Sequence, residues 1–392
     1  MRSKFLGGIL LIVGTSIGGG MLALPVANAT NGFGLSSLAL LLCWVIMTLG
    51  ALFILEVNLY LPPGKNILSM AIATLGIPGL LVAWVSYLLL LYALLSAYIS
   101  GGTDVLDSLL QLIHVHVDTK LLSCLFILIF GNIVYGGIKQ VDLFNRGLMF
   151  AKLGTFLILI ILISPFIHVD NLLHNNHYQL TNNSMILITS FGFAIIVPDL
   201  RNYFQNDIKL LKKVVFIGSL LPLCCYIAWD AVIMGSLAVD GSTGLMGLTD
   251  DAHTTSSLAK ILCSTVHKPV ITLLFNFFTS VCMLTAFLGV SLCLISFLSD
   301  GLGLSKTGTQ GLILFMLTFV PPLTMAIFFP GMYLYALNYA GIFCIILLLL
   351  LPALMSYVGR KKFPSAYQVP GGKLSQWLVI ICSLILLFIA LF

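Results

Sequence analysis

Long runs of apolar residues, separated by short polar segments, make up most of the chain. Eleven of these runs are long enough to form membrane-crossing helices, because about 20 apolar residues span the hydrocarbon layer of a bilayer. These helices are predicted at residues 5–30, 33–60, 79–103, 120–137, 145–166, 184–205, 214–238, 269–298, 309–329, 333–357 and 374–392. The pattern predicts an all-α integral membrane protein with a single transmembrane domain over residues 1–392.

The composition and the positions of basic residues agree with this prediction. The chain is 60% hydrophobic and 8% charged, whereas soluble domains carry about 25% charged residues. An orientation with the N-terminus in the cytoplasm places fifteen basic residues at cytoplasmic ends or loops and three outside. The three outside are Lys120, Lys260 and Lys268. This follows the positive-inside rule, so we expect a cytoplasmic N-terminus, a C-terminus outside and no nucleic-acid partner.

The first apolar run is interrupted by glycine. Gly14, Gly18, Gly19 and Gly20 lie in the middle of the predicted first helix, and each glycine costs roughly 1 kcal/mol relative to alanine. Amide groups freed at this depth need new partners, because lipid offers none. Broken helices of this kind form the substrate sites of many transporters. The sequence therefore predicts a carrier.

A similar motif recurs five helices later. Residues 15–18 (TSIG) and 189–192 (TSFG) match, and a proline follows each at a similar distance, Pro25 and Pro198. The first helix runs outward and the sixth inward, as expected for inverted repeats of five helices. A chance match of four residues is the alternative. The repeats would cover residues 5–166 and 184–357, with 374–392 as an added helix.

The two predicted breaks offer groups for an amino acid. Amides of Gly18, Gly19 and Gly20 begin the outer half of the first helix, where a carboxylate can bind. The carbonyls that could bind an ammonium belong to Thr15, Ser16, Ser190 and Phe191. A zwitterionic amino acid fits this pair of opposed helix ends, and glycine lets the backbone approach it closely.

Four segments resemble the hydroxy and aromatic amino-acid permease family, which includes the tyrosine and tryptophan carriers of bacteria. They are GTSIGGGMLALP (14–25), LEVNLY (55–60), NRGLMFAK (145–152) and TSFGFAIIVPDL (189–200). The resemblance implies a LeuT-type fold with a 5+5 inverted repeat and an eleventh helix. It also implies proton-coupled import of an aromatic amino acid across the bacterial inner membrane. Other neutral amino acids such as serine or threonine, and sodium coupling, are the alternatives.

The resemblance also assigns roles to residues. The substrate backbone would be held by Thr15, Ser16, Ile17, Gly18, Gly19 and Gly20. The site would be completed by Ser190, Phe191, Gly192 and Phe193. Phe191 and Phe193 are candidates to stack on an aromatic substrate or to close over it.

Ionisable residues within membrane helices are functional candidates. Lys152 resembles a helix 5 lysine that replaces a sodium ion between helices 1 and 8 in proton-coupled relatives, and its ammonium could bond carbonyls near Ile17. Snorkelling of Lys152 to the cytoplasmic interface is the alternative. Glu56, the one glutamate of the chain, and Asp230 are further candidates for proton coupling or gating.

Weaker candidates for substrate contact lie on the third helix. Tyr92 and Ser96 are four residues apart and share one helix face. Polar residues in membrane helices often bond only to neighbouring helices, so a structural role is the alternative for both.

Other classes of function lack support in the sequence. There is no H-E-x-x-H motif, nucleophile elbow or repeated filter loop, as a membrane enzyme or a channel would have. His168, His174 and His177 are irregularly spaced in one loop, which favours a solvated loop over a metal site. We expect no cofactor, only the coupling ion, an amino-acid substrate and surrounding lipid; the oligomeric state is left open.

Overall fold

The computed structural model describes residues 2–112, 114–173, 184–205, 207–239, 244–248, 251, 254–266, 268–329, 331–363 and 367–391. Each element within these ranges is helical. His174 and His177 lie outside them.

The first half of the chain contains an interrupted helix followed by four further long helices. The elements are α1 (Arg2–Ser16), α2 (Gly19–Asn28), the 3₁₀ turn η1 (Ala29–Asn31), α3 (Gly32–Asn58), α4 (Ile67–Leu112), α5 (Thr119–Tyr135) and α6 (Ile138–Ile163). A short turn η2 (Ser164–Phe166) and the small helix α7 (Val169–Leu173) follow.

The second half also begins with an interrupted helix. It contains α8 (Ser184–Ser190), the 3₁₀ segment η3 (Gly192–Ile196), α9 (Val197–Tyr203), α10 (Ile208–Ser236), η4 (Leu245–Leu248), α11 (Thr254–Val266), α12 (Pro269–Leu302) and α13 (Gly308–Phe328). The chain continues through α14 (Met332–Cys344), the π-helical segment η5 (Ile345–Leu350) and α15 (Leu351–Lys362), and α16 (Gly372–Leu391) follows.

Nine helices within the described residues are long and apolar enough to cross a membrane. One of the nine runs from α2 through α3, and two shorter apolar helices, Lys4–Ser16 and Thr119–Tyr135, accompany them. The protein is therefore a multi-pass membrane protein. The helices lie where the apolar runs predict them, although α4, α6 and α10 begin earlier than expected.

The helix α4 contains a bend that the sequence analysis did not include. Gly76 has φ +75° and ψ −156°, a conformation outside the helical region. Only glycine adopts it readily, and Pro78 follows two residues later. Residues 67–75 therefore form a separate helical piece in the region predicted as a loop.

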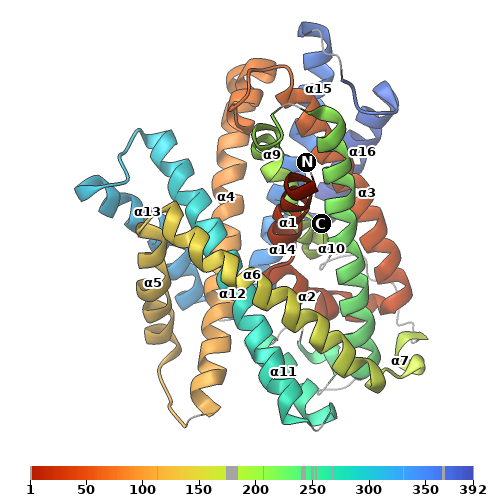
Figure 1. The fold of residues 1–392 in the computed structure, drawn as a ribbon, viewed down its shortest axis with the longest axis vertical. Helices are drawn as coiled ribbons and strands as arrows, with labels where there is room; N and C mark the ends of the chain where they lie inside the picture. Colours follow the sequence, from red (N-terminus) through yellow and green to blue (C-terminus); the bar gives the residue numbers. More distant parts are fainter. Residues whose placement is uncertain are drawn as a thin grey trace.

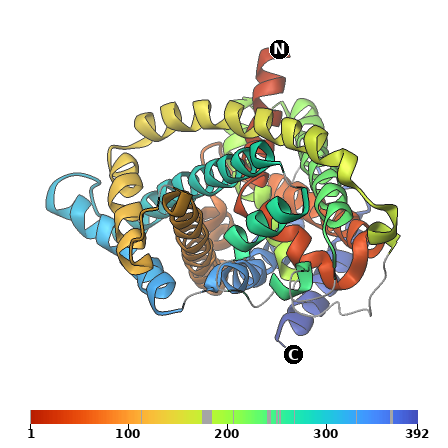
Figure 2. The ribbon, with the colours of Figure 1, turned by 90° about the horizontal axis from the view of Figure 1, so that it is seen from below.

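The two interrupted helices occupy the centre of the bundle. α1 packs on α10, while α2 contacts α8, α10 and α12. In Figure 1, α5 and α13 lie side by side at one edge, and α3 and α16 lie together at the opposite edge. Seen from below in Figure 2, α6 runs along the outside of α12. This arrangement surrounds both breaks with long helices.

Candidate functional site

Both predicted interruptions are present in the structure. α1 ends at Ser16, Gly18 is fully extended with φ −149° and ψ −150°, and α2 begins at Gly19. In the second half, α8 ends at Ser190 and the chain continues as a tighter 3₁₀ segment before α9. The matching Thr-Ser pairs therefore both end a helix.

A single side chain connects the two breaks. The Tyr226 hydroxyl on α10 lies 2.7 Å from the carbonyl oxygen of Ser16 and 2.7 Å from that of Ser190. The backbones are also close, because a Cβ added to Gly20 would lie 2.9 Å from the Ser190 hydroxyl oxygen. The last residues of α1 and α8 thus lie side by side in the protein interior.

Carbonyl groups at the first break receive donors from different helices. Tyr226 on α10 donates a hydrogen bond to the carbonyl of Ser16. Lys152 on α6 donates to the carbonyl of Ile17 at 2.5 Å. Tyr333 on α14 donates to the carbonyl of Gly19. Because unpaired backbone groups are costly in a membrane interior, these side chains stabilise the broken conformation. They also concentrate polar groups at one place in an apolar bundle.

The position of Lys152 agrees with the predicted contact. Its side chain is 1% exposed, so it does not snorkel to the interface. Its ammonium donates to the Ile17 carbonyl and lies 3.3 Å from the hydroxyl oxygen of Thr285 on α12. It therefore joins α6, the first break and α12, while its role in proton coupling stays a prediction.

The aromatic residues of the second break are fully buried. Phe191 and Phe193 are both 0% exposed. The Phe191 ring packs edge-on against Tyr226, with 5.2 Å between ring centroids. Thr15, by contrast, is exposed, and its hydroxyl donates back to the Leu11 carbonyl within α1.

On α4, the described contacts of Tyr92 and Ser96 point to α13. The Tyr92 hydroxyl donates to the Leu317 carbonyl at 2.7 Å, and the Ser96 hydroxyl lies 3.7 Å from the Met325 sulfur. Tyr98 instead faces the break, since a Cβ on Gly19 would lie 2.6 Å from its ring. Ser96 and Tyr98 are two residues apart in the sequence, so their side chains point about 200° apart around the helix. This explains why Tyr98 faces the break while Ser96 does not. A substrate contact by Tyr92 or Ser96 stays a prediction.

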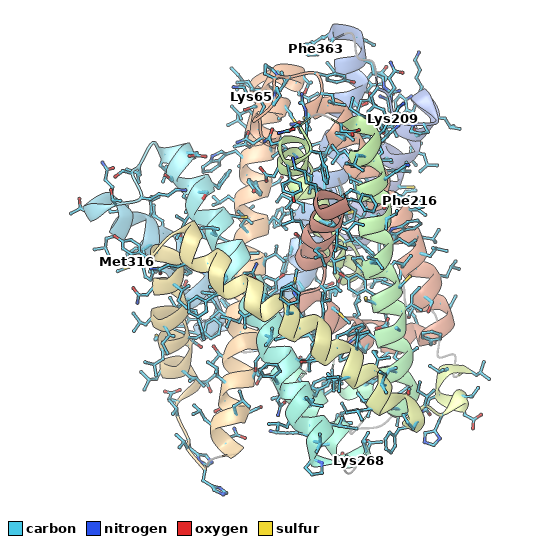
Figure 3. The ribbon with its side chains drawn as sticks, viewed as in Figure 1. Lys65, Lys209, Phe216, Lys268, Met316 and Phe363 are labelled. Atoms are coloured by element: carbon cyan, nitrogen blue, oxygen red, sulfur yellow. The ribbon has the colours of Figure 1, made fainter. Side chains whose placement is uncertain are left out.

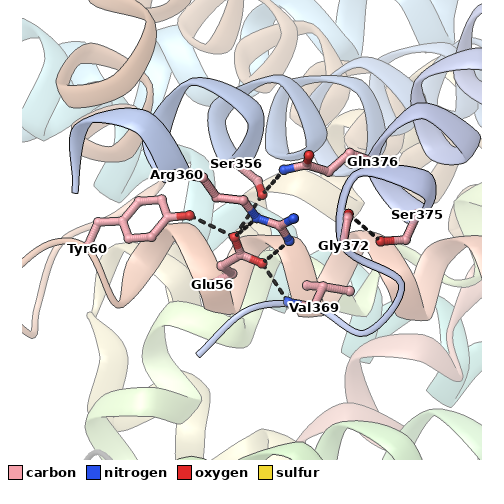
Figure 4. Close-up of polar contacts among 8 residues, drawn as sticks. All are labelled: Glu56, Tyr60, Ser356, Arg360, Val369, Gly372, Ser375 and Gln376. Atoms are coloured by element: carbon pink, nitrogen blue, oxygen red, sulfur yellow. Dashed lines mark hydrogen bonds and ion pairs between the residues drawn. The ribbon is translucent and has the colours of Figure 1, made fainter. Parts of the chain in front are cut away.

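Glu56 lies in a fully paired network at one end of the bundle (Figure 4). Arg360 on α15 binds both carboxylate oxygens, at 2.7 and 2.8 Å. Tyr60 and Ser356 donate to one oxygen, and the Val369 amide donates to the other. The network links α3, α15 and the segment before α16, and a gating role for it is untested.

Two tyrosines beside this network lie outside the spans. Burial, together with the hydrogen bond to Glu56, raises the pKa of Tyr60 above its ordinary value. Burial and the nearby Glu56 charge raise the pKa of Tyr367 to about 12. Both phenols therefore stay neutral at physiological pH, and Tyr60 donates its hydrogen to Glu56.

Asp230 is fully buried on α10 and bonds the end of α2. Its Oδ2 lies 2.5 Å from the amide nitrogen of Asn28. Its other oxygen has no hydrogen-bond partner among the described residues. Asp230 is therefore paired with a neutral amide, and its predicted role in coupling or gating is open.

Sequence analysis missed Tyr226, Tyr333 and Asp104. Asp104 on α4 is buried and accepts hydrogen bonds from the Thr255 hydroxyl and from the amide and hydroxyl of Ser256 in the first turn of α11. Acidic groups favour helix N-termini, so Asp104 ties α11 to α4. For Tyr226 one signal was available, its position one turn before Asp230.

Among the described residues, no group of three or more His, Cys, Asp or Glu side chains could hold a metal ion.

Comparison with known proteins identifies the family. A sequence model of the tryptophan/tyrosine permease family matches residues 1–390. The chain belongs to this family. It is therefore a transporter of the permease type and not an enzyme.

Individual relatives match this permease over nearly its whole length. It is 33% identical over 388 residues to tyrosine-specific transport system 1 of Haemophilus influenzae, covering 98% of this chain and 96% of the relative. The tryptophan-specific transport protein of the same organism is 32% identical, with coverage of 97% and 94%. Glutamine transporter 2 of Aliivibrio fischeri is 30% identical, with 99% of both chains covered.

The contact between Gly19 and Tyr98 gives a first prediction. In Gly19→Ala the new Cβ has no room beside the Tyr98 ring, so substrate binding should weaken at least about tenfold, as overpacking costs about 1–3 kcal/mol. The measurement is equilibrium binding by the purified permease in detergent. Gly289→Ala on α12 is the matched control, because a Cβ there meets nothing within 4 Å. Equal binding by both variants would contradict the importance of this close approach.

Proposed function

We propose that this permease is a proton-coupled symporter that imports an aromatic amino acid, tyrosine or tryptophan, by alternating access. The observation that carries the proposal is the meeting of two interrupted helices, joined through Tyr226. Relatives named as tyrosine-specific and tryptophan-specific transporters, similar over almost the whole chain, support the substrate class.

The breaks suit both ends of a zwitterion. Amides in the first turn of α2, from Gly18 to Gly20, lack partners within the helix and favour a carboxylate. The carbonyls of Ser16 and Ser190, 2.7 Å from the same hydroxyl oxygen, favour an ammonium. The Phe191 ring packs on Tyr226 and the Tyr98 ring lies against Gly19, which supports an aromatic side chain in the site.

A carrier for another neutral amino acid is the second candidate. The similarity to glutamine transporter 2 of Aliivibrio fischeri, at 30% identity, favours it. The backbone groups at the breaks recognise what all amino acids share, so the side-chain pocket decides between these substrates.

Helix packing supports a LeuT-type arrangement of two inverted five-helix repeats. α3 packs on α10, α4 on α12 and α5 on α13, which pairs equivalent helices of the two halves. The contact of α6 with α12 is matched by that of α14 with α4. Lys65 and Lys209 lie at one end and Lys268 at the other (Figure 3), in line with a cytoplasmic N-terminus under the positive-inside rule.

Lys152 is the proposed coupling residue. Unwound carbonyls coordinate sodium ions or protons in transporters with broken helices, and here the Lys152 ammonium occupies that position at Ile17. Loss of its proton would remove the positive charge, weaken the hydrogen bond to Ile17 and loosen the contact of the break with α6 and α12. This supports proton coupling, with sodium coupling as the alternative.

Uptake by the full chain in proteoliposomes tests the proposed function. We expect labelled tyrosine or tryptophan to accumulate when the outside is made acidic, and not with a sodium gradient alone. Saturable uptake of glutamine or serine without aromatic uptake would favour the second candidate. Non-saturating flux independent of any gradient would contradict a symporter.

The role of Lys152 gives a separate prediction. Lys152→Ala should reduce pH-driven accumulation at least about tenfold, because hydrogen bonds to charged groups contribute about 1.5–3 kcal/mol. Lys306→Ala is a suitable control, since Lys306 is exposed and bonds Ser296. If Lys152→Ala accumulates substrate like the unmodified protein, Lys152 does not couple transport to protons.

Phe193 provides the test of side-chain recognition. Phe193→Ala should weaken inhibition by tyrosine and tryptophan by about tenfold, as lost aromatic packing costs about 1 kcal/mol beyond the buried area. Serine inhibition should change little, measured by competition for uptake. Phe150→Ala, at a 77% exposed position on α6, controls for loss of a phenyl group. Equal losses for aromatic amino acids and serine would argue against stacking by Phe193.

A further inference from the structure

The hydroxyl of Tyr226 lies beside more hydrogen-bond acceptors than its single hydrogen can bond. It lies 2.7 Å from each of two carbonyl oxygens, those of Ser16 and Ser190. A phenol has one hydrogen to donate, and a carbonyl has none. Tyr226 is 0% exposed, so bulk water does not supply the missing donor. Three oxygen atoms from α1, α8 and α10 therefore share one proton.

A second hydroxyl, which can both donate and accept a hydrogen bond, lies in the same cluster. Ser16 is 4% exposed and its hydroxyl lies next to that of Tyr226. The Ser16 oxygen has no well-formed hydrogen-bond partner among the described residues. Buried polar groups are nearly always paired in proteins, so this cluster, made of Ser16, Ser190 and Tyr226, has room for a further donor.

We propose that the Tyr226 hydroxyl is a specificity-determining contact for the primary ammonium of the substrate. This inference rests on the proposed function, because it requires an amino-acid substrate. An ammonium has three N–H donors, which match the two carbonyls and a lone pair of the Tyr226 oxygen. Each carbonyl has two lone pairs, so Tyr226 can keep its own hydrogen bond to one of them.

The empty and occupied sites then differ in a defined way. Without substrate, the Tyr226 hydroxyl is the hydrogen-bond donor that, among the described residues, faces the carbonyls at the ends of both α1 and α8. With substrate, the ammonium joins the same three oxygens and strengthens that link, since charge-assisted hydrogen bonds are about twice as strong as neutral ones. Tyr226 thus makes the contact between the breaks depend on the amino group of the ligand.

The test compares an amino acid with its des-amino analogue, which keeps the side chain and carboxylate and has hydrogen in place of the ammonium. The unmodified permease should bind the amino acid far more tightly, measured by competition with labelled substrate. Tyr226→Phe should weaken amino-acid binding about tenfold and leave the analogue almost unchanged, since it removes one hydrogen bond to a charged group. The preference for the amino group should fall by the same factor.

Tyr333→Phe is the matched control. Tyr333 is also a buried phenol and donates to the carbonyl of Gly19 at the same break. Any loss of binding in this variant should affect the amino acid and the analogue equally and keep their ratio. Ser16→Ala should also lower the ratio of the affinity for the amino acid to the affinity for the analogue, as Tyr226→Phe does. If Tyr226→Phe does not elute as a folded monodisperse protein, Ser16→Ala is used for the test in its place.

The outcomes separate this inference from the proposed function. The same measurement is made with tyrosine, tryptophan and glutamine and their des-amino analogues. If the unmodified protein binds none of these amino acids, the proposed function is wrong. If it binds one of them and Tyr226→Phe keeps the unmodified ratio, Tyr226 has only a structural role and the inference is overturned.

Discussion

The structure depends on satisfying backbone groups that two broken helices release inside an apolar bundle. Lipid and apolar side chains offer no hydrogen bonds, so every freed carbonyl needs a donor from elsewhere in the protein. Tyr226 and Lys152 provide these donors at Ser16 and Ile17, and Tyr333 adds a hydrogen bond to Gly19 in the first turn of α2. The same groups that make the break stable also concentrate polar atoms there, so the proposed substrate site coincides with a structural requirement.

This requirement also explains which helices surround the centre. The donors come from α10, α6 and α14, so these helices must pack where their polar side chains reach the break. α12 joins them through Thr285, which lies 3.3 Å from the Lys152 ammonium. Away from the break, Glu56 follows the same rule, since its buried carboxylate is paired with Arg360 and further donors. Polar residues within the spans thus decide how otherwise similar apolar helices are arranged.

The sequence predicts the breaks well because glycine and repeated motifs act locally. Gly18 to Gly20 weaken a helix wherever it packs, and a charged residue such as Lys152 must find a partner in any membrane fold. Tyr226 and Tyr333 could not be recognised in this way, because a tyrosine in an apolar helix fits lipid, core or interface equally well. Tyr92 and Ser96 share one face of their helix, but which face turns inward depends on helix rotation, and this is set by packing across the whole bundle.

One helix holds both sides of the first break, and this bears on how the protein can move. On α10, Tyr226 contacts Ser16 at the end of α1, and Asp230 one turn later bonds Asn28 at the end of α2. Moving α10 against either half-helix breaks a buried hydrogen bond, which leaves a polar group unpaired at a cost of about 1–3 kcal/mol. A ligand that donates hydrogen bonds to the carbonyls of Ser16 and Ser190 offsets that cost at the end of α1. It does not offset the cost of breaking the Asp230 contact at the end of α2. Under the proposed alternating access, α10 is therefore expected to move with one half of the interrupted helix while it separates from the other.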